Sequence, residues 1–185
     1  MLTLQLIIRT AIDCYVLLLL LRAWLYAVLN DRYNPFYLLI VQWTQPMVKK
    51  CHRLIPPKSR LDISVIFLAL ALLVLRTFLL TWLQRPHSFG FSMINIGIGL
   101  LALLKLSGKL LFWVITLRII SSWIYRENYL LYDTLQQLSE LILTPIRRWV
   151  PPTYGLDWSC ALCTLLLILL NRLGYDLYGT LWGQL

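Results

Sequence analysis

The sequence predicts an all-α integral membrane protein built from two tandem repeats in the same orientation. Its 185 residues are 59% hydrophobic with a mean hydropathy of +0.72, whereas a typical soluble domain contains about 45–50% apolar residues. The formal net charge is +9, and the basic residues lie beside the apolar segments rather than on a separate polar domain. This placement is typical of membrane proteins whose loops face anionic headgroups, and it argues against a nucleic-acid-binding protein.

One stretch of sequence occurs twice, each time immediately before a long apolar segment. "CHRLIPPKSRLDIS" covers residues 51–64 and "IRRWVPPTYGLDWS" covers residues 146–159, a constant offset of 95 residues. The matching positions are Arg53 with Arg148, Pro56 and Pro57 with Pro151 and Pro152, Asp62 with Asp157, and Ser64 with Ser159. The duplication predicts a first repeat over residues 1–88 and a second over residues 89–185.

Four apolar segments are long enough to cross a bilayer, which takes about 20 helical residues. They cover residues 4–29, 62–83, 91–125 and 158–178. The first is longer than the apolar region of a signal peptide and lacks a small-residue cleavage site, so we expect a permanent helix. The third would be about 50 Å long at ~1.5 Å per residue. We interpret it as one long helix with a kink near Ser107-Gly108, with two spans there, and five in the chain, as the alternative.

The distribution of Lys and Arg predicts the topology, because short cytoplasmic connections carry an excess of them. Residues 30–61 contain six, residues 126–156 contain three, and the short link at residues 84–90 contains only Arg85. We therefore expect both long connections in the cytoplasm and both termini on the opposite side. With one span between the second and last segments, the two repeats have the same orientation.

Each long connection contains an apolar pattern with a helical period. Apolar residues recur at steps of three and four, and the set shifted by 95 residues is also apolar. The two sets are Phe36, Ile40, Trp43, Met47, Cys51 and Leu54, and Leu131, Leu135, Leu138, Ile142, Ile146 and Trp149. A helix with one apolar stripe and a basic face is typical of the membrane interface, with a cytoplasmic helical hairpin as the alternative. We expect Pro46 and Pro145 to interrupt or kink these helices.

Basic residues near the end of each amphipathic segment are candidate ligands for the headgroups of anionic phospholipids. They are Lys49, Lys50 and Arg53 in the first copy, and Arg147 and Arg148 in the second. Phospholipids of this kind are therefore one expected partner.

The repeated stretch after each amphipathic segment predicts a structural corner. A residue that precedes proline is disfavoured in a helix, so Pro56-Pro57 and Pro151-Pro152 should end the surface helix. Asp62 and Asp157 then stand where the next span begins. A carboxylate there can accept the first N–H groups and meets the positive end of the helix dipole. The alternative is a paired Asp62/Asp157 ion or substrate site between the repeats.

Polar side chains inside the apolar segments are costly and mark candidate functional positions. Asn95, Lys105 and Lys109 form a candidate intramembrane polar site, with structural pairing inside the bundle as the alternative. Arg9 and Asp13 are four residues apart, so they share a helix face and can pair. The arginines nearer to span ends are Arg22, Arg76 and Arg118. We expect these three side chains to reach toward the membrane surface.

The four cysteines form no pattern typical of a disulfide framework or a zinc site. Cys160 and Cys163 make a lone CxxC pair within the last apolar segment, where we expect them to act as small apolar residues. The sequence also lacks a Gly-rich phosphate loop and a paired nucleophile and base. We therefore expect no catalytic residues, no cofactor and no metal.

These motifs resemble the YggT family, also called YlmG in some lineages. The segments that carry the resemblance are "NPFYLLIVQWTQPMVKKCHRLIPPKSRLDIS" and "LTPIRRWVPPTYGLDWS". His52-Arg53 departs from the family's double arginine, and Arg60 stands where the first copy usually has a small residue or proline. The resemblance implies a multi-pass protein of the bacterial inner membrane, which with the charge pattern places both termini in the periplasm. It also implies roles in membrane-complex assembly, division and osmotic tolerance and, for plastid relatives, in haem attachment to a b-type cytochrome.

Three functions stay open on these grounds. The first is a non-enzymatic scaffold or assembly factor that binds lipid through its amphipathic helices and docks a membrane-protein partner or a second copy. The second is a small oligomeric ion transporter or channel component linked to osmotic stress. The third is a factor in haem attachment or cytochrome assembly with His52 as a ligand, although a lone histidine on a basic surface helix is more often plain polar surface. The doubled amphipathic pattern favours the scaffold.

Overall fold

The computed structural model describes residues 2–29, 34–54, 62–84, 93–124, 129–148 and 158–185. These residues form α1 (Leu2–Val28), α2 (Pro35–Leu54), α3 (Ile63–Gln84), α4 (Met93–Ile124), α5 (Tyr129–Arg147), α6 (Trp158–Tyr178) and α7 (Thr180–Gln184), and the described ranges include no strand. The predicted all-α class is confirmed. Four helices (α1, α3, α4 and α6) are long and apolar enough to cross a membrane. Because α4 runs through Ser107 and Gly108 without interruption, the five-span alternative is wrong.

Contacts divide the chain into two compact units. The first contains most of α1, all of α2 and α3, the part of α4 that ends at Ser107, and Leu185. The second contains the part of α4 that begins at Gly108, together with α5, α6 and α7. Compactness is a different property from sequence repetition, so the repeat boundary between residues 88 and 89 stays a prediction.

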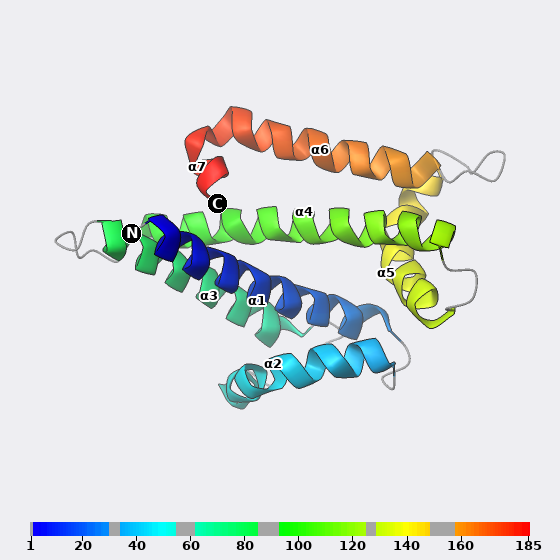
Figure 1. Ribbon diagram of the computed structural model, residues 1–185, viewed down its shortest axis with the longest axis horizontal. Coiled ribbons are helices and arrows are strands. Elements are labelled where there is room, and N and C mark those ends of the chain that lie inside the picture. The colour runs from blue at the N-terminus through cyan, green and yellow to red at the C-terminus, as the bar shows by residue number, and fades with distance from the viewer. Residues whose placement is uncertain (1, 30–33, 55–61, 85–92, 125–128, 149–157) are drawn as a thin grey trace. The chain divides into compact units, whose positions relative to one another are not determined.

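In the first unit, α1 and α3 run alongside each other, and α2 lies below them in the view of Figure 1. The fully buried apolar residues include Val16 and Leu19 of α1 and Val65, Ala69 and Leu73 of α3. Their steps of three and four turn one face of each helix into the core. The N-terminal part of α4 approaches closely because Gly99 has no side chain: a Cβ there would lie 2.7 Å from Cγ2 of Val74.

The core of the second unit joins three helices. Ile115 of α4, Leu143 of α5, and Cys160 and Cys163 of α6 form one buried cluster, with Ile142 and Ile146 of α5 among the partly buried residues packed on it. Cys160 and Cys163 are buried in this cluster and form no disulfide with another described cysteine. Their role as small apolar residues stays a prediction.

The sequence did not predict the hook at the end of α6. Gly179, with a φ of 54°, supplies the left-handed residue that ends the helix, and α7 turns back from it. Nε1 of Trp182 donates a hydrogen bond to Oδ1 of Asn171 at 3.0 Å, and its ring lies on Gly174, where a Cβ would meet the indole at 2.3 Å. Gly174 is thus the position that lets the tryptophan pack on α6.

The helices α2 and α5 occupy the two long connections, and each runs through its proline. The expectation that Pro46 and Pro145 interrupt these helices is therefore wrong, and the alternative that they kink them stays a prediction. The predicted apolar stripe of α2 also divides in a way that periodicity did not show. Ile40 and Cys51 are buried, whereas Phe36, Trp43 and Met47 are exposed. The apolar stripe is wider than the surface that α2 buries against the rest of the unit. One edge of the stripe is therefore buried and the other edge is exposed.

Candidate functional site

A buried hydrogen bond joins α1 to α2 in the first unit. Nη1 of Arg22 donates to Oγ1 of Thr44 at 2.8 Å, and this hydroxyl donates in turn to the backbone carbonyl of Ile40 at 2.7 Å. Tyr37 and Asp62 lie close enough to Arg22 to interact with it electrostatically. A buried charge is tolerated only when hydrogen-bonded, and the hydroxyl serves as acceptor and donor at once.

The same contact occurs in the second unit. Nη1 of Arg118 in α4 donates to Oγ of Ser139 in α5 at 2.5 Å, and Ser139 donates to the carbonyl of Leu135 at 2.8 Å. Thr44 and Ser139 are 95 positions apart, and the two arginines are 96 apart. We call this pair of interactions the arginine–hydroxyl contacts. Each ties a membrane-spanning helix to the helix that follows it.

The expectation that Arg22, Arg76 and Arg118 reach the membrane surface is wrong. These side chains are 7%, 1% and 8% exposed, and each makes a polar contact inside the protein. A hydroxyl residue occurs at both position 44 and position 139, with the same 95-residue offset as the apolar stripes. This repetition is the sequence feature that could have indicated partners for the arginines.

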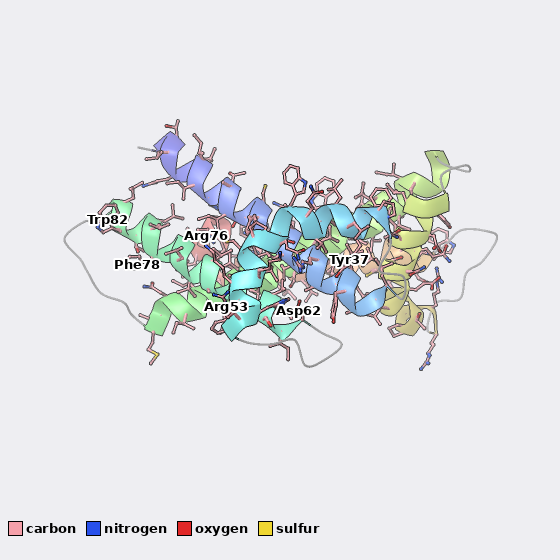
Figure 2. All side chains as sticks on the ribbon, turned by 90° about the horizontal axis from the view of Figure 1, so that it is seen from below. Tyr37, Arg53, Asp62, Arg76, Phe78 and Trp82 are labelled. Atoms are coloured by element: carbon pink, nitrogen blue, oxygen red, sulfur yellow. The ribbon has the colours of Figure 1, made fainter. Side chains whose placement is uncertain are left out.

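The junction of α2 and α3 is held by a second polar contact. Nε2 of His52 lies 3.1 Å and 3.0 Å from the two carboxylate oxygens of Asp62. Cys51 Sγ, one residue earlier, donates to the carbonyl of Ser64 at 3.3 Å. Figure 2 shows Asp62 at the start of α3, near the end of α2 that carries Arg53. His52 is thus part of the junction and not plain polar surface.

Asp62 directly precedes α3, as predicted, but its carboxylate does not make the predicted cap. The helix α3 begins at the next residue, and the backbone carbonyl of Asp62 accepts the N–H of Val65 at 3.0 Å. Among the described residues, the carboxylate contacts His52 instead of the first N–H groups of α3. The imidazole of His52, at the end of α2, contacts both carboxylate oxygens that a helix cap would use. Asp157 and the prolines Pro56, Pro57, Pro151 and Pro152 lie outside the described residues.

An ion pair links the membrane-spanning helices α1 and α3. Arg76 of α3 pairs with Asp13 of α1, and Nε of Arg9 lies 3.9 Å from the other oxygen of the same carboxylate. The predicted pairing of Arg9 and Asp13 is confirmed. The Arg76 side chain lies between α1 and α3 (Figure 2). Its Nε is buried and has no hydrogen-bond partner among the described residues.

The polar residues predicted on α4 differ in burial, and their role as one intramembrane site stays a prediction. Asn95 is buried, Lys105 is half-buried and Lys109 is exposed. At ~1.5 Å per residue, Asn95 lies about 15 Å along the helix from Lys105. Among the described residues of the spans, the buried Arg76 pairs with the partly buried Asp13.

The candidate lipid-binding residues differ in exposure between the two copies. Lys49, Lys50 and Arg53 are all exposed on α2. Arg148 is exposed as well, whereas Arg147 is half-buried. In the part of the chain that the structure describes, no group of three or more His, Cys, Asp or Glu residues could hold a metal ion.

Comparison with known proteins gives one family. The CCB3/YggT family matches residues 1–83 and 98–178. An uncharacterized protein in the proC 3' region of Vibrio alginolyticus is 37% identical over 179 residues, which is 97% of each chain. The uncharacterized protein YggT of Escherichia coli K12 is 34% identical over 91% of this chain and 87% of its own. An uncharacterized Haemophilus influenzae protein is 33% identical over 96% and 94% of the two chains. No solved structure matches the chain significantly.

Proposed function

The chain belongs to the CCB3/YggT family, and from this premise we propose that it is a non-enzymatic scaffold of the bacterial inner membrane, with both termini in the periplasm. Its two membrane-surface helices, α2 and α5, bind the bilayer surface and dock a membrane protein. The four candidate spans anchor these helices.

The pair of arginine–hydroxyl contacts is the observation that carries this proposal. Removing the acceptor from a buried guanidinium is expensive, so each contact resists rotation or release of its helix. Four spans alone would not require two further helices fixed in position beside them, so we infer that α2 and α5 have a role at the membrane surface. The contacts keep the polar faces of α2 and α5 turned outward, where a partner can recognise them.

The polar face of α5 supports a protein as one of the docked partners. Side-chain hydrogen bonds join Gln136 to Glu140 at 2.8 Å and Gln137 to Asp133 at 3.0 Å. These i,i+4 pairs order four polar side chains on one surface of the helix. An ordered set of donors and acceptors suits recognition of another protein or of a second copy of the chain.

The experiment compares the membrane proteins that co-purify with the full-length chain and with the variant Thr44→Val/Ser139→Ala in a mild detergent. The variant removes both hydroxyl acceptors and leaves every span sequence unchanged. We expect the intact chain to retain a defined set of membrane proteins, and the variant to lose that set while eluting as a single species. Identical sets from both proteins, or an empty set from the intact chain, would contradict the scaffold.

A transporter or channel component is the second candidate, and the Asp13–Arg76 pair is the observation that favours it. Charges buried within spans often mark ion or proton pathways, and the Arg76 Nε has no partner among the described residues. Four candidate spans are few for a pathway, so this function requires an oligomer. It predicts that Arg76→Gln abolishes growth under osmotic stress even at temperatures at which the melting curve shows that the variant is still folded. The scaffold predicts that growth falls only when the protein is destabilised.

A further inference from the structure

The surface of α2 divides into three faces. One face is buried in the first unit and consists of Ile40, Thr44, Val48 and Cys51. Beside it lies an exposed apolar strip of Phe36, Leu39, Trp43 and Met47, in which Trp43 is 67% exposed. The exposed basic residues Lys49, Lys50 and Arg53 occupy the last turns. An apolar strip next to cationic side chains fits the boundary between headgroups and acyl chains.

The helix α5 offers a different surface. Several of its apolar residues are used in the core of the second unit, since Leu143 is buried and Ile142 and Ile146 pack on the cluster of α4 and α6. Its exposed large apolar residues are Leu131 and Leu141. Its charged residues are Asp133, Glu140 and Arg147, and Arg148 follows directly after the helix, so α5 has no excess of basic residues. In contrast, α2 has three Lys and Arg residues and no acidic residue.

The connections of α2 hold it at a membrane surface. It begins seven residues after the end of α1, and α3 begins nine residues after its own end. Consecutive spans meet on one side of the bilayer, and α2 contacts both of its neighbours there, since Thr44 binds Arg22 near the end of α1 and Cys51 binds Ser64 near the start of α3. The apolar strip and the basic residues are therefore within reach of lipid in the folded chain.

We propose that α2, rather than α5, is the principal site at which this chain binds anionic phospholipid. The inference rests on the proposed function and assigns separate partners to the two helices. Phosphate headgroups bind Lys49, Lys50 and Arg53 while the strip around Trp43 enters the acyl boundary. The balanced charges of α5 leave it to a protein partner.

The test titrates short-chain phosphatidylglycerol, and in parallel short-chain phosphatidylcholine, into the purified full-length chain in an uncharged detergent. Each neutralised charge near an anionic surface is worth about 1 kcal/mol, and about 1.4 kcal/mol is tenfold in affinity. Lys49→Gln/Lys50→Gln/Arg53→Gln should therefore weaken phosphatidylglycerol binding by about 100-fold and leave phosphatidylcholine binding unchanged. The matched control Arg147→Gln/Arg148→Gln removes two charges that lie outside the proposed site, so it should weaken phosphatidylglycerol binding far less than the triple variant does.

Equal losses in both variants, or no loss in the first, would overturn the inference. A measurement on the unmodified chain covers the case in which the triple variant does not fold: high salt should abolish the preference for phosphatidylglycerol, and a preference that survives salt would also overturn it. If the lipid titration fails while the intact chain still retains its co-purifying membrane proteins, only the assignment of lipid to α2 is rejected. The scaffold is tested separately, by whether Thr44→Val/Ser139→Ala loses those proteins.

Discussion

The guanidinium of Arg22 and the hydroxyl of Thr44 lie 2.8 Å apart in a buried contact between α1 and α2. Arg118 and Ser139 make the corresponding contact between α4 and α5 at 2.5 Å. In each case the hydroxyl also binds the backbone of its own helix one turn earlier. The contact therefore fixes both the position and the rotation of the helix that carries the hydroxyl.

Replacing Thr44 by valine keeps the shape of the side chain and removes the acceptor for Arg22. We expect the free energy of unfolding to fall by about 1–3 kcal/mol, the cost of leaving a buried polar group without its partner. Thr44→Ser should cost much less. The measurement is a melting curve in detergent, with Thr10→Val as control, because Thr10 is exposed and its hydroxyl binds the carbonyl of Leu6. Equal effects at positions 10 and 44 would contradict the role of the contact.

The His52–Asp62 contact should appear as coupling between the two residues. In a double-mutant cycle of His52→Ala and Asp62→Ala, the two losses of stability should fail to add by about 0.5–3 kcal/mol, as contacting residues do. His52→Arg should be tolerated, since the position 95 residues later is Arg147. Strict additivity would instead support an Asp62 that acts only as a helix cap, worth about 0.5–2 kcal/mol by itself.

Breaking the Asp13–Arg76 pair from one side should be strongly destabilising. Removal of one partner of a buried pair leaves an uncompensated charge and costs about 3–5 kcal/mol, so Asp13→Asn should lower the melting temperature sharply. Arg9→Gln is the control, because the more exposed Arg9 lies 3.9 Å from the same carboxylate and such pairs contribute at most about 1 kcal/mol. Similar shifts for both variants would argue against a special role for Arg76.

Gly174→Ala should displace Trp182 from α6. The new Cβ would lie 2.3 Å from the indole, so the ring must move and its hydrogen bond to Asn171 should be lost. We expect increased oxidation of Trp182 by a water-soluble reagent, followed by mass spectrometry of the peptide. Gly97→Ala is a suitable control, since nothing lies within 4 Å of a Cβ at that position. An unchanged oxidation of Trp182 would contradict the packing.

Helix type and extent could be predicted from the sequence because apolar length and period are local properties. The segments expected at residues 62–83 and 158–178 correspond to α3 and α6, which begin at Ile63 and Trp158. The partners of the arginines could not be predicted in the same way. Arg76 meets Asp13 across 63 positions, and such a contact depends on which faces of two helices meet. Lys and Arg near span ends can reach the surface, so position alone did not distinguish a buried arginine from an exposed one.

The division of the α2 stripe was hidden for a related reason. Periodicity shows that Ile40 and Trp43 lie near one side of the helix, but burial depends on how wide a surface α1 and α3 offer. Ile40 is buried there and Trp43 is not. The exposed strip that motivates the lipid proposal is thus visible only once the helices are packed.

The proposed scaffold requires α2 and α5 to lie on the same, cytoplasmic side of the membrane, and the accessibility of single cysteines tests this placement. Lys50→Cys and Arg148→Cys are suitable because both positions are exposed, and each is made in a variant in which Cys14, Cys51, Cys160 and Cys163 are replaced by alanine or serine. We predict that a membrane-impermeant thiol reagent labels neither protein in intact spheroplasts and labels both after permeabilisation. Labelling of only one of the two cysteines in intact spheroplasts would contradict the same-orientation arrangement, and labelling of both would contradict the cytoplasmic placement.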